Sequence, residues 1–145
     1  MKKIILAALI VTFGAVNAQK AASNSKIETN KIDKNLVGLW KGSEKDQQVK
    51  GMEKLWIMER KADGTFMLLF TTVQDCEVDQ QVEKGQWWIE NGEFHELHYS
   101  SGQTDIYSYQ VLDPSHIRFK SKEQSMEMST DNYTFIDTRI EEEDQ

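Results

Sequence analysis

Short stretches of alternating apolar and polar residues recur along the chain, and most of them end in residues that favour a turn. Alternation with a period of two residues is typical of a β-strand with one buried face. Beyond residue 18, no segment carries apolar residues at helical spacing over the length of a helix. The expected strands cover residues 36–42, 55–61, 65–73, 82–90, 93–99, 104–112, 117–120 and 126–140.

The connections between these strands are short, so sequential strands are expected to run antiparallel. Asp63-Gly64, Asn91-Gly92, Ser101-Gly102 and Asp113-Pro114 mark four of the turns, and Asp63-Gly64 is a strong hairpin signal. Eight antiparallel strands can close into a barrel, which removes exposed edges, or divide into a two-sheet sandwich. The near-equal hairpins favour the barrel. We therefore predict an all-β fold, an up-and-down barrel of about eight antiparallel strands over residues 36–140.

The hairpin at Asn91-Gly92 decides which neighbouring side chains face the barrel interior. A two-residue loop would divide the apolar residues between both faces. A three-residue loop that includes Glu90 pairs Trp87 with His95 and gathers the apolar side chains on one face. This register places Trp87, Ile89, His95, Leu97 and Tyr99 inside the barrel, and Trp88, Phe94, Glu96 and His98 outside.

The first eighteen residues have the features of a secretory signal peptide. Met1-Lys2-Lys3 is positively charged, residues 4–16 are largely apolar, and Val16-Asn17-Ala18 resembles a signal-peptidase site. We expect cleavage after Ala18 and export to the periplasm or out of the cell. The apolar stretch is too short to span a bilayer comfortably, and no later stretch is long and apolar enough, so no membrane span is expected. Residues 19–35 are expected to form a polar linker, and residues 141–145 an acidic tail.

The composition is that of a globular domain rather than a nucleic-acid-binding one. A chain of 145 residues fits a single domain. Acidic residues outnumber basic ones by 24 to 17, whereas phosphate recognition needs clustered basic side chains. Cys76 is the single cysteine of the sequence, so no intrachain disulfide can form. In an oxidising compartment it is either a small buried residue or a reactive thiol.

Three short motifs resemble those of lipocalins and of the smaller lipocalin-like proteins of bacterial envelopes. Gly38-Leu39-Trp40 matches the G-x-W signature at the first strand, and Thr104-Asp105 with Tyr109 is similar to the family's T-D-x-x-x-Y motif. In that family a basic residue of the last strand lies over the tryptophan at the barrel floor, and Arg139 is at the matching position. The resemblance implies a cation–π contact worth about 0.5–1 kcal/mol or more. This chain is shorter than typical lipocalins, has no disulfide pair and shows no C-terminal helix, which implies a smaller ligand cup.

The sequence offers little catalytic or metal-binding chemistry. It has no G-x-S-x-G elbow, no phosphate-binding loop and no dinucleotide-binding glycine pattern. His95 and His98 are three residues apart on one expected strand, so their side chains point to opposite faces and cannot hold one metal ion. We therefore expect no enzymatic activity, no metal site and no cofactor.

The aromatic side chains are more numerous than the floor of a small barrel needs. They either fill the interior or line an open cavity that binds a ligand, with His95 or a tyrosine hydroxyl as the orienting polar group. For the open cavity we predict an exported, non-catalytic binding protein for a small apolar molecule. Its expected ligand-binding residues are Trp56, Phe70, Trp87, His95, Tyr99 and Tyr107.

The alternative function is a protein-interaction module of the cell envelope, such as an inhibitor or immunity-type protein that binds a basic partner. An acidic protein gains association rate with a cationic partner through electrostatic steering. The expected contact surface combines the outward Trp88 with Asp75, Glu77 and Asp79 of the polar segment between the third and fourth strands.

Overall fold

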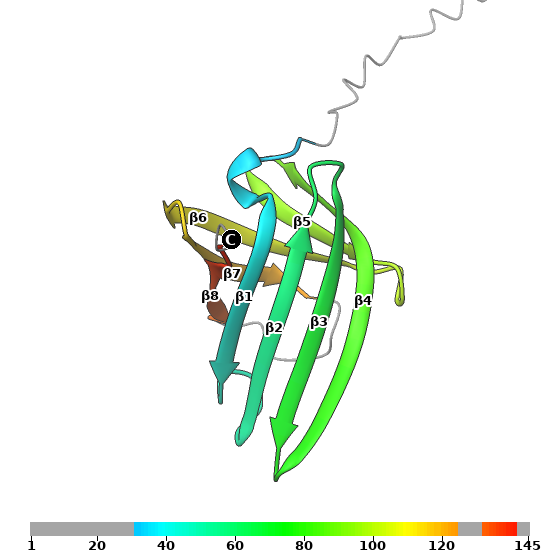
Figure 1. The fold of residues 1–145 in the computed structure, drawn as a ribbon, viewed down its shortest axis with the longest axis vertical. Helices are drawn as coiled ribbons and strands as arrows, with labels where there is room; N and C mark the ends of the chain where they lie inside the picture. The colour runs from blue at the N-terminus through cyan, green and yellow to red at the C-terminus, as the bar shows by residue number, and fades with distance from the viewer. Residues whose placement is uncertain (1–30, 125–131, 142–145) are drawn as a thin grey trace, which may run out of the picture.

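The computed structural model describes residues 31–124 and 132–141 of the chain. Eight antiparallel strands follow one another in sequence order around a closed barrel (Figure 1). They are β1 (Gly38–Lys45), β2 (Met52–Arg60), β3 (Thr65–Gln74), β4 (Glu77–Glu90), β5 (Glu93–His98), β6 (Thr104–Asp113), β7 (His116–Glu123) and β8 (Thr134–Arg139), preceded by the 3-10 turn η1 (Lys34–Leu36). The predicted all-β barrel is confirmed. Within the described ranges, no helix has the length and apolar character to cross a membrane.

The main difference from the expected strands lies at the hairpin between β3 and β4. The two strands stay paired until Gln74 opposes Glu77, so β4 begins at Glu77 instead of at residue 82. Asp75 and Cys76 form the two-residue turn, with φ angles of 52° and 65°. Positive φ at both positions gives a turn whose twist matches that of the flanking strands. The polar segment therefore extends the hairpin instead of interrupting it.

Parts of the expected organisation lie outside the described residues. These are the signal peptide, the linker up to residue 30, the first residues of the expected last strand and the end of the acidic tail. The described part of the last strand is β8, which begins at Thr134.

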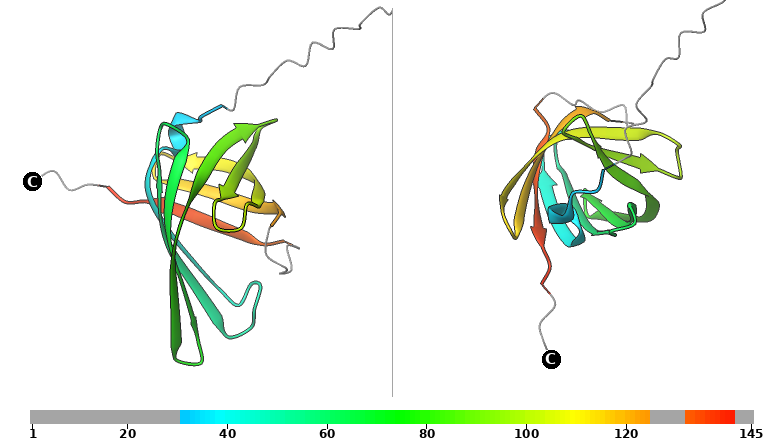
Figure 2. Two further views of the ribbon diagram at one scale, coloured as in Figure 1. Left: turned by 90° about the vertical axis from the view of Figure 1, so that its right-hand side faces the viewer. Right: turned by 90° about the horizontal axis from the view of Figure 1, so that it is seen from above.

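The barrel is asymmetric, because β1 to β4 extend beyond the other strands at one end (Figure 2). β1 pairs with β2 over eight residues, but with β8 only at Trp40 and Lys41. The barrel is thus closed along a short seam near one end, and the long strands diverge from β8 beyond it.

The closed end of the barrel is built around Trp40, which is fully buried. Its indole Nε1 donates a hydrogen bond to the carbonyl oxygen of Leu36 in η1 (2.9 Å), and η1 lies across this end of the barrel (Figure 2). The guanidinium carbon of Arg139 lies 4.1 Å from the centre of the Trp40 ring, and its nitrogens donate to the carbonyl oxygens of Asn35 and Val37. The expected contact between Arg139 and Trp40 is confirmed.

Gly38, the first residue of the G-x-W motif, is needed for the same contact. It has a φ of 133°, a conformation that side-chain-bearing residues rarely adopt. A Cβ at this position would also collide with the guanidinium of Arg139. Gly38, Trp40 and Arg139 therefore meet at one point, where they join the first strand to the last.

The β4–β5 hairpin has a two-residue loop, so the predicted register is wrong. Trp88 opposes His95 and Ile89 opposes Phe94, while Asn91 and Gly92 have the positive φ angles of a tight turn. The inward side chains are Trp87, Ile89, Phe94, Glu96 and His98, and the outward ones are Trp88, His95, Leu97 and Tyr99. The prediction assumed one uniformly apolar inward face. The interior is apolar near the floor and becomes charged towards the open end.

Candidate functional site

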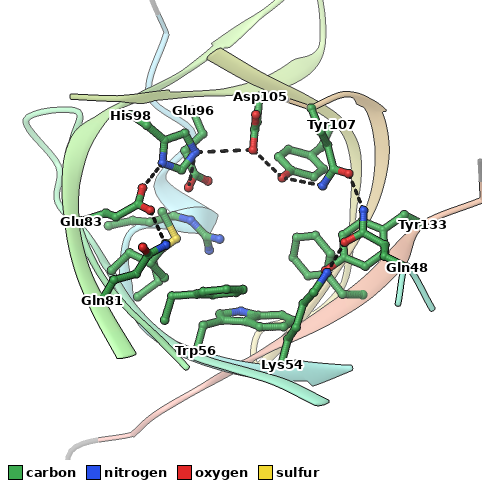
Figure 3. A pocket seen from close by; sticks show the side chains of 16 residues that line it. Gln48, Lys54, Trp56, Gln81, Glu83, Glu96, His98, Asp105, Tyr107 and Tyr133 are labelled. Atoms are coloured by element: carbon green, nitrogen blue, oxygen red, sulfur yellow. Dashed lines mark hydrogen bonds and ion pairs between the residues drawn. The ribbon is translucent and has the colours of Figure 1, made fainter. Parts of the chain in front are cut away.

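A cavity of about 110 Å³ lies inside the barrel, beyond the apolar layer next to the floor (Figure 3). Exposed Gln81 lies at its rim. An empty apolar cavity of about 150 Å³ is known to accommodate benzene, so this one has room for most of a small ring. It is lined by Gln48, Lys54, Trp56, Met58, Arg60, Leu68, Phe70, Gln81, Glu83, Glu96, His98, Asp105, Tyr107, Gln124, Tyr133 and Phe135.

One wall of the cavity is aromatic, and Trp56 of β2 is its fixed centre. The ring of Trp56 meets that of Phe135 edge to face, with 5.1 Å between centres, and its Nε1 donates a hydrogen bond to Asp137 (2.8 Å). The ring lies against Gly42 of β1, where a Cβ would collide with it. The absence of a side chain at Gly42 is what allows Trp56 to lie flat against β1. Phe70 of β3 continues this apolar wall.

The opposite wall is acidic and surrounds a single imidazole ring. His98 Nδ1 contacts Glu83 Oε2 at 2.5 Å, while its Nε2 lies 3.4 Å from Asp105 Oδ2 and 3.5 Å from Glu96 Oε1. Burial alone would lower the pKa of His98, but the interactions with Asp105, Glu96 and Glu83 outweigh it and raise the pKa to about 9. The ring is therefore a cation at neutral pH, with three carboxyl groups around it.

Glu96 is the least satisfied group of this acidic wall. It is 8% exposed and points into the cavity (Figure 3). Within the described ranges its oxygens accept no hydrogen bond, and the 3.5 Å contact with His98 is its closest ionic interaction. Burial raises the pKa of Glu96 to about 7, against the opposing attraction of His98 and Arg60. An ionised Glu96 lacks the hydrogen-bond donors that a buried carboxylate normally has.

A chain of hydrogen bonds continues from the acidic wall around the cavity (Figure 3). The Tyr107 hydroxyl donates to Asp105 Oδ2 (3.2 Å) and accepts from Gln124 Nε2 (3.4 Å). Gln48 Nε2 donates to Gln124 Oε1 (2.7 Å), and Lys54 Nζ donates to Gln48 Oε1. These contacts hold polar side chains from several strands and loops in a ring above the aromatic wall.

The two basic side chains of β2 have carboxylate partners of their own. Lys54 Nζ lies 3.1 Å from Glu44 Oε1, and Arg60 Nη2 lies 2.5 Å from Asp137 Oδ2. All four side chains are buried. These two ion pairs are distinct from the group of carboxyl side chains around His98.

The structure brings three of the six predicted ligand-binding residues together. Trp56, Phe70 and Tyr107 line the cavity. Trp87 is buried below it, stacked on Phe94 in the apolar layer. The inward placement of His95 and Tyr99 is wrong, because both follow the outward face of the corrected β5 register.

The residues that sequence reasoning missed are those of the polar wall, above all Glu96 and His98. The Asn91-Gly92 dipeptide is the strongest sequence signal for a two-residue hairpin turn. A two-residue turn at Asn91-Gly92 pairs Trp87 with Glu96, as observed, so Glu96 and His98 face inward. The predicted register instead gathers Trp87, Ile89, Leu97 and Tyr99 on one face, which turns Glu96 and His98 outward.

Trp88 faces outward, as predicted, and is half-buried. Its ring stacks on that of His95, with 5.2 Å between centres, and its Nε1 donates to Glu90. Asp79 is nine residues away on the same strand, which corresponds to about 30 Å. A contact that uses both Trp88 and the acidic hairpin tip would therefore extend along β4, and the interaction module remains a prediction. Cys76, at the same tip, is exposed, so its buried alternative is wrong.

A second hollow of about 790 Å³ lies outside the barrel, between the outer faces of β1 to β3 and β8. Its lining includes the exposed apolar side chains of Leu55, Ile57, Leu69 and Ile136. It lacks the buried charged groups of the interior cavity. The residues described here hold no group of three or more potential ligands arranged for a metal ion. The interior cavity is therefore the candidate site.

No protein-family model matches this chain, and no significantly similar protein is found among curated proteins. The function is accordingly argued from the geometry of the cavity itself.

Proposed function

We propose that this protein is an exported, lipocalin-like binding protein that holds a small amphipathic molecule in its barrel without catalysing a reaction. The observation that carries the proposal is the interior cavity, in which an aromatic wall faces a ring of polar and charged side chains. Ligand sites in proteins commonly combine an apolar lining with a few convergent polar groups that fix orientation. The arrangement of Gly38, Trp40 and Arg139 at the floor supports the lipocalin-like assignment.

The polar lining changes the ligand chemistry from the apolar molecule predicted from the sequence. A wholly apolar ligand would cover the carboxyl groups of Glu96 and Asp105 without offering them a hydrogen bond. Removing a polar group from water without a partner costs about 1–3 kcal/mol, and more for a charged group. A ligand that is apolar at one end and polar at the other places a suitable group against each wall.

The size of the cavity favours a compact ligand. A volume of about 110 Å³ is below the range of about 300–1,000 Å³ that is common for drug-sized ligands. Long-chain fatty acids, haem and retinoids are therefore poor fits. A single ring with a short polar substituent fits the space between the aromatic wall and the polar ring.

The proposal is tested by calorimetric titration with three probes of one size: benzyl alcohol, benzylammonium and benzoate. At least one of them should bind with one-to-one stoichiometry, in the micromolar to millimolar range expected for so few atoms. Leu68→Trp, which fills the cavity, should abolish binding. Leu69→Trp, the adjacent residue on the outer face of β3, is the matched control and should retain it.

Circular dichroism establishes that both variants fold. Phe70→Trp, nearer the exposed end of β3, is a second cavity variant that disturbs the barrel less than Leu68→Trp. Binding of none of the three probes to the wild-type protein would refute the proposal. Equal binding by Leu68→Trp and Leu69→Trp would place the site elsewhere and refute it as well.

A further inference from the structure

Three carboxyl groups surround the imidazole ring of His98. Glu83, Glu96 and Asp105 all lie within 3.5 Å of one of the two ring nitrogens of His98. The three acidic groups share this one ring, which carries a single positive charge when it is protonated. In a largely buried site the repulsion between neighbouring carboxylates is costly, because water screens it only weakly.

The carboxyl group of Glu96 is the place in the cavity where an additional positive charge would bind. Its side chain is nine-tenths buried, it faces the cavity and, within the described ranges, it accepts no hydrogen bond. A buried carboxylate without donors is unusual in a folded protein. A donor placed inside the cavity is the partner that this geometry lacks.

The cations of β2 do not fill this role. Lys54 reaches Glu44 and Gln48 on the other side of the cavity (Figure 3), and Arg60 is held by Asp137. The guanidinium of Arg60 also lies about 5 Å from the ring centres of Phe94 and Phe119. Both cations thus have carboxylate partners outside the group around His98, although Arg60 also attracts Glu96 electrostatically.

We infer that the ligand of this cavity is an organic cation, an amine whose ammonium group binds between Glu96 and Asp105 while its apolar part lies against Trp56 and Phe70. This inference rests on the proposed function and names the chemical class of its ligand. An ammonium group supplies the donors that Glu96 lacks and places a positive charge between two carboxyl groups. The nearby aromatic rings also favour an organic cation over a bare metal ion.

The pKa of Glu96 is consistent with this assignment. Burial raises it to about 7, so near neutral pH the carboxyl group is divided between its protonated and ionised forms. The carboxyl faces His98, Asp105, Arg60 and Asp137, and a bound ammonium would add a further positive charge to that set. Binding of the amine is expected to favour the ionised form of Glu96.

The test compares benzylammonium, benzyl alcohol and benzoate at about pH 7.5, where Glu96 is largely ionised. The three probes share one ring and differ in charge. Benzylammonium should bind at least about tenfold more tightly than benzyl alcohol, as expected for one charge-assisted hydrogen bond, and benzoate should bind most weakly. Glu96→Gln should bring the affinity for benzylammonium to within about threefold of that for benzyl alcohol in the same variant.

Glu59→Gln removes the same charge from the outer face of β2 and is the matched control, which should preserve the preference. If benzyl alcohol and benzylammonium bind the wild-type protein equally well, the inference is overturned while the binding function stands. If the preference persists in Glu96→Gln, the acidic wall is not the amine site and the inference is likewise overturned. If no probe binds, the proposed function fails and this inference fails with it.

Discussion

Asp137 bonds to two side chains in the part of the interior that separates the floor from the cavity. Its replacement by asparagine tests the contribution of these contacts to stability. The side chain is fully buried and accepts hydrogen bonds from Trp56 Nε1 (2.8 Å) and Arg60 Nη2 (2.5 Å). Asparagine has the same shape and keeps an acceptor for Trp56, but it removes the negative charge. Arg60, which is 2% exposed, would then be a buried cation without a counterion.

The expected loss follows from the burial of this pair. Removing one partner of a buried ion pair costs about 3–5 kcal/mol, because the other charge stays desolvated. The Nε and Nη1 atoms of Arg60 are buried without an acceptor in the described part of the chain, so little else can compensate for its charge. The contacts with nearby aromatic rings offset only a fraction of this cost. We therefore predict that Asp137→Asn lowers the free energy of unfolding by about 3–4 kcal/mol.

Equilibrium unfolding in urea, followed by tryptophan fluorescence, measures this loss. The double variant Arg60→Met/Asp137→Asn is the control, because it removes both charges, keeps an acceptor for Trp56 and should regain most of the lost stability. The interaction energy comes from the corresponding double-mutant cycle. A loss below about 1 kcal/mol for Asp137→Asn would refute the assignment of Arg60 and Asp137 as a buried, mutually dependent pair.

Three further predictions concern the floor, the acidic wall and the hairpin tip. Trp40→Ala should lower the free energy of unfolding, measured in urea, by about 3–5 kcal/mol, as for other buried aromatic residues. A loss of less than about 0.5 kcal/mol, the range of surface substitutions, would contradict the place of Trp40 in the floor. Burial raises the pKa of Glu96 from 4.5 to about 7, and despite burial the pKa of His98 rises from 6.5 to about 9. Both groups bind protons more tightly when folded. The stability from Glu96 is therefore complete below pH 4.5 and lost as the pH rises to about 7, and that from His98 is lost between pH 6.5 and about 9. Urea unfolding at several pH values should show this decline, with Glu96→Gln flattening its lower part, and an unchanged profile in that variant would count against the assignment. Cys76→Gly should raise the free energy of unfolding by about 1 kcal/mol, because glycine adopts a φ of 65° without strain and the exposed cysteine makes no buried contact. A lower unfolding midpoint in urea would contradict this explanation of the turn.

Much of the architecture follows from local signals in the sequence. Turn dipeptides such as Asp63-Gly64 and Asn91-Gly92 divide the chain into strands, and the short connections allow only antiparallel neighbours. The G-x-W resemblance located the closed end and its partner Arg139 correctly. These features depend on a few residues whose conformational or packing requirements are specific, so they can be recognised without knowledge of the tertiary structure.

The candidate site was harder to predict, because it breaks the pattern from which the fold was inferred. The prediction chose the β4–β5 register that collects apolar residues on one face. In the structure the inward positions of β5 are Phe94 near the floor and Glu96 and His98 beyond it. A buried charged residue is stable only with partners from other strands, here Glu83 and Asp105. Those partners are identified only when the strand pairing across the barrel is known.

The position of a bound amine inside the barrel can be measured by nuclear magnetic resonance. Isotope-filtered nuclear Overhauser spectra of the labelled protein with benzylammonium report which side chains lie within a few ångströms of the ligand. We expect contacts between the ligand ring and both Trp56 and Phe70, with the methylene group next to the ammonium near Glu96 and Asp105. Contacts confined to Ile57 and Leu69 of the second hollow outside the barrel, or no contacts at saturating ligand, would contradict an amine site inside the barrel.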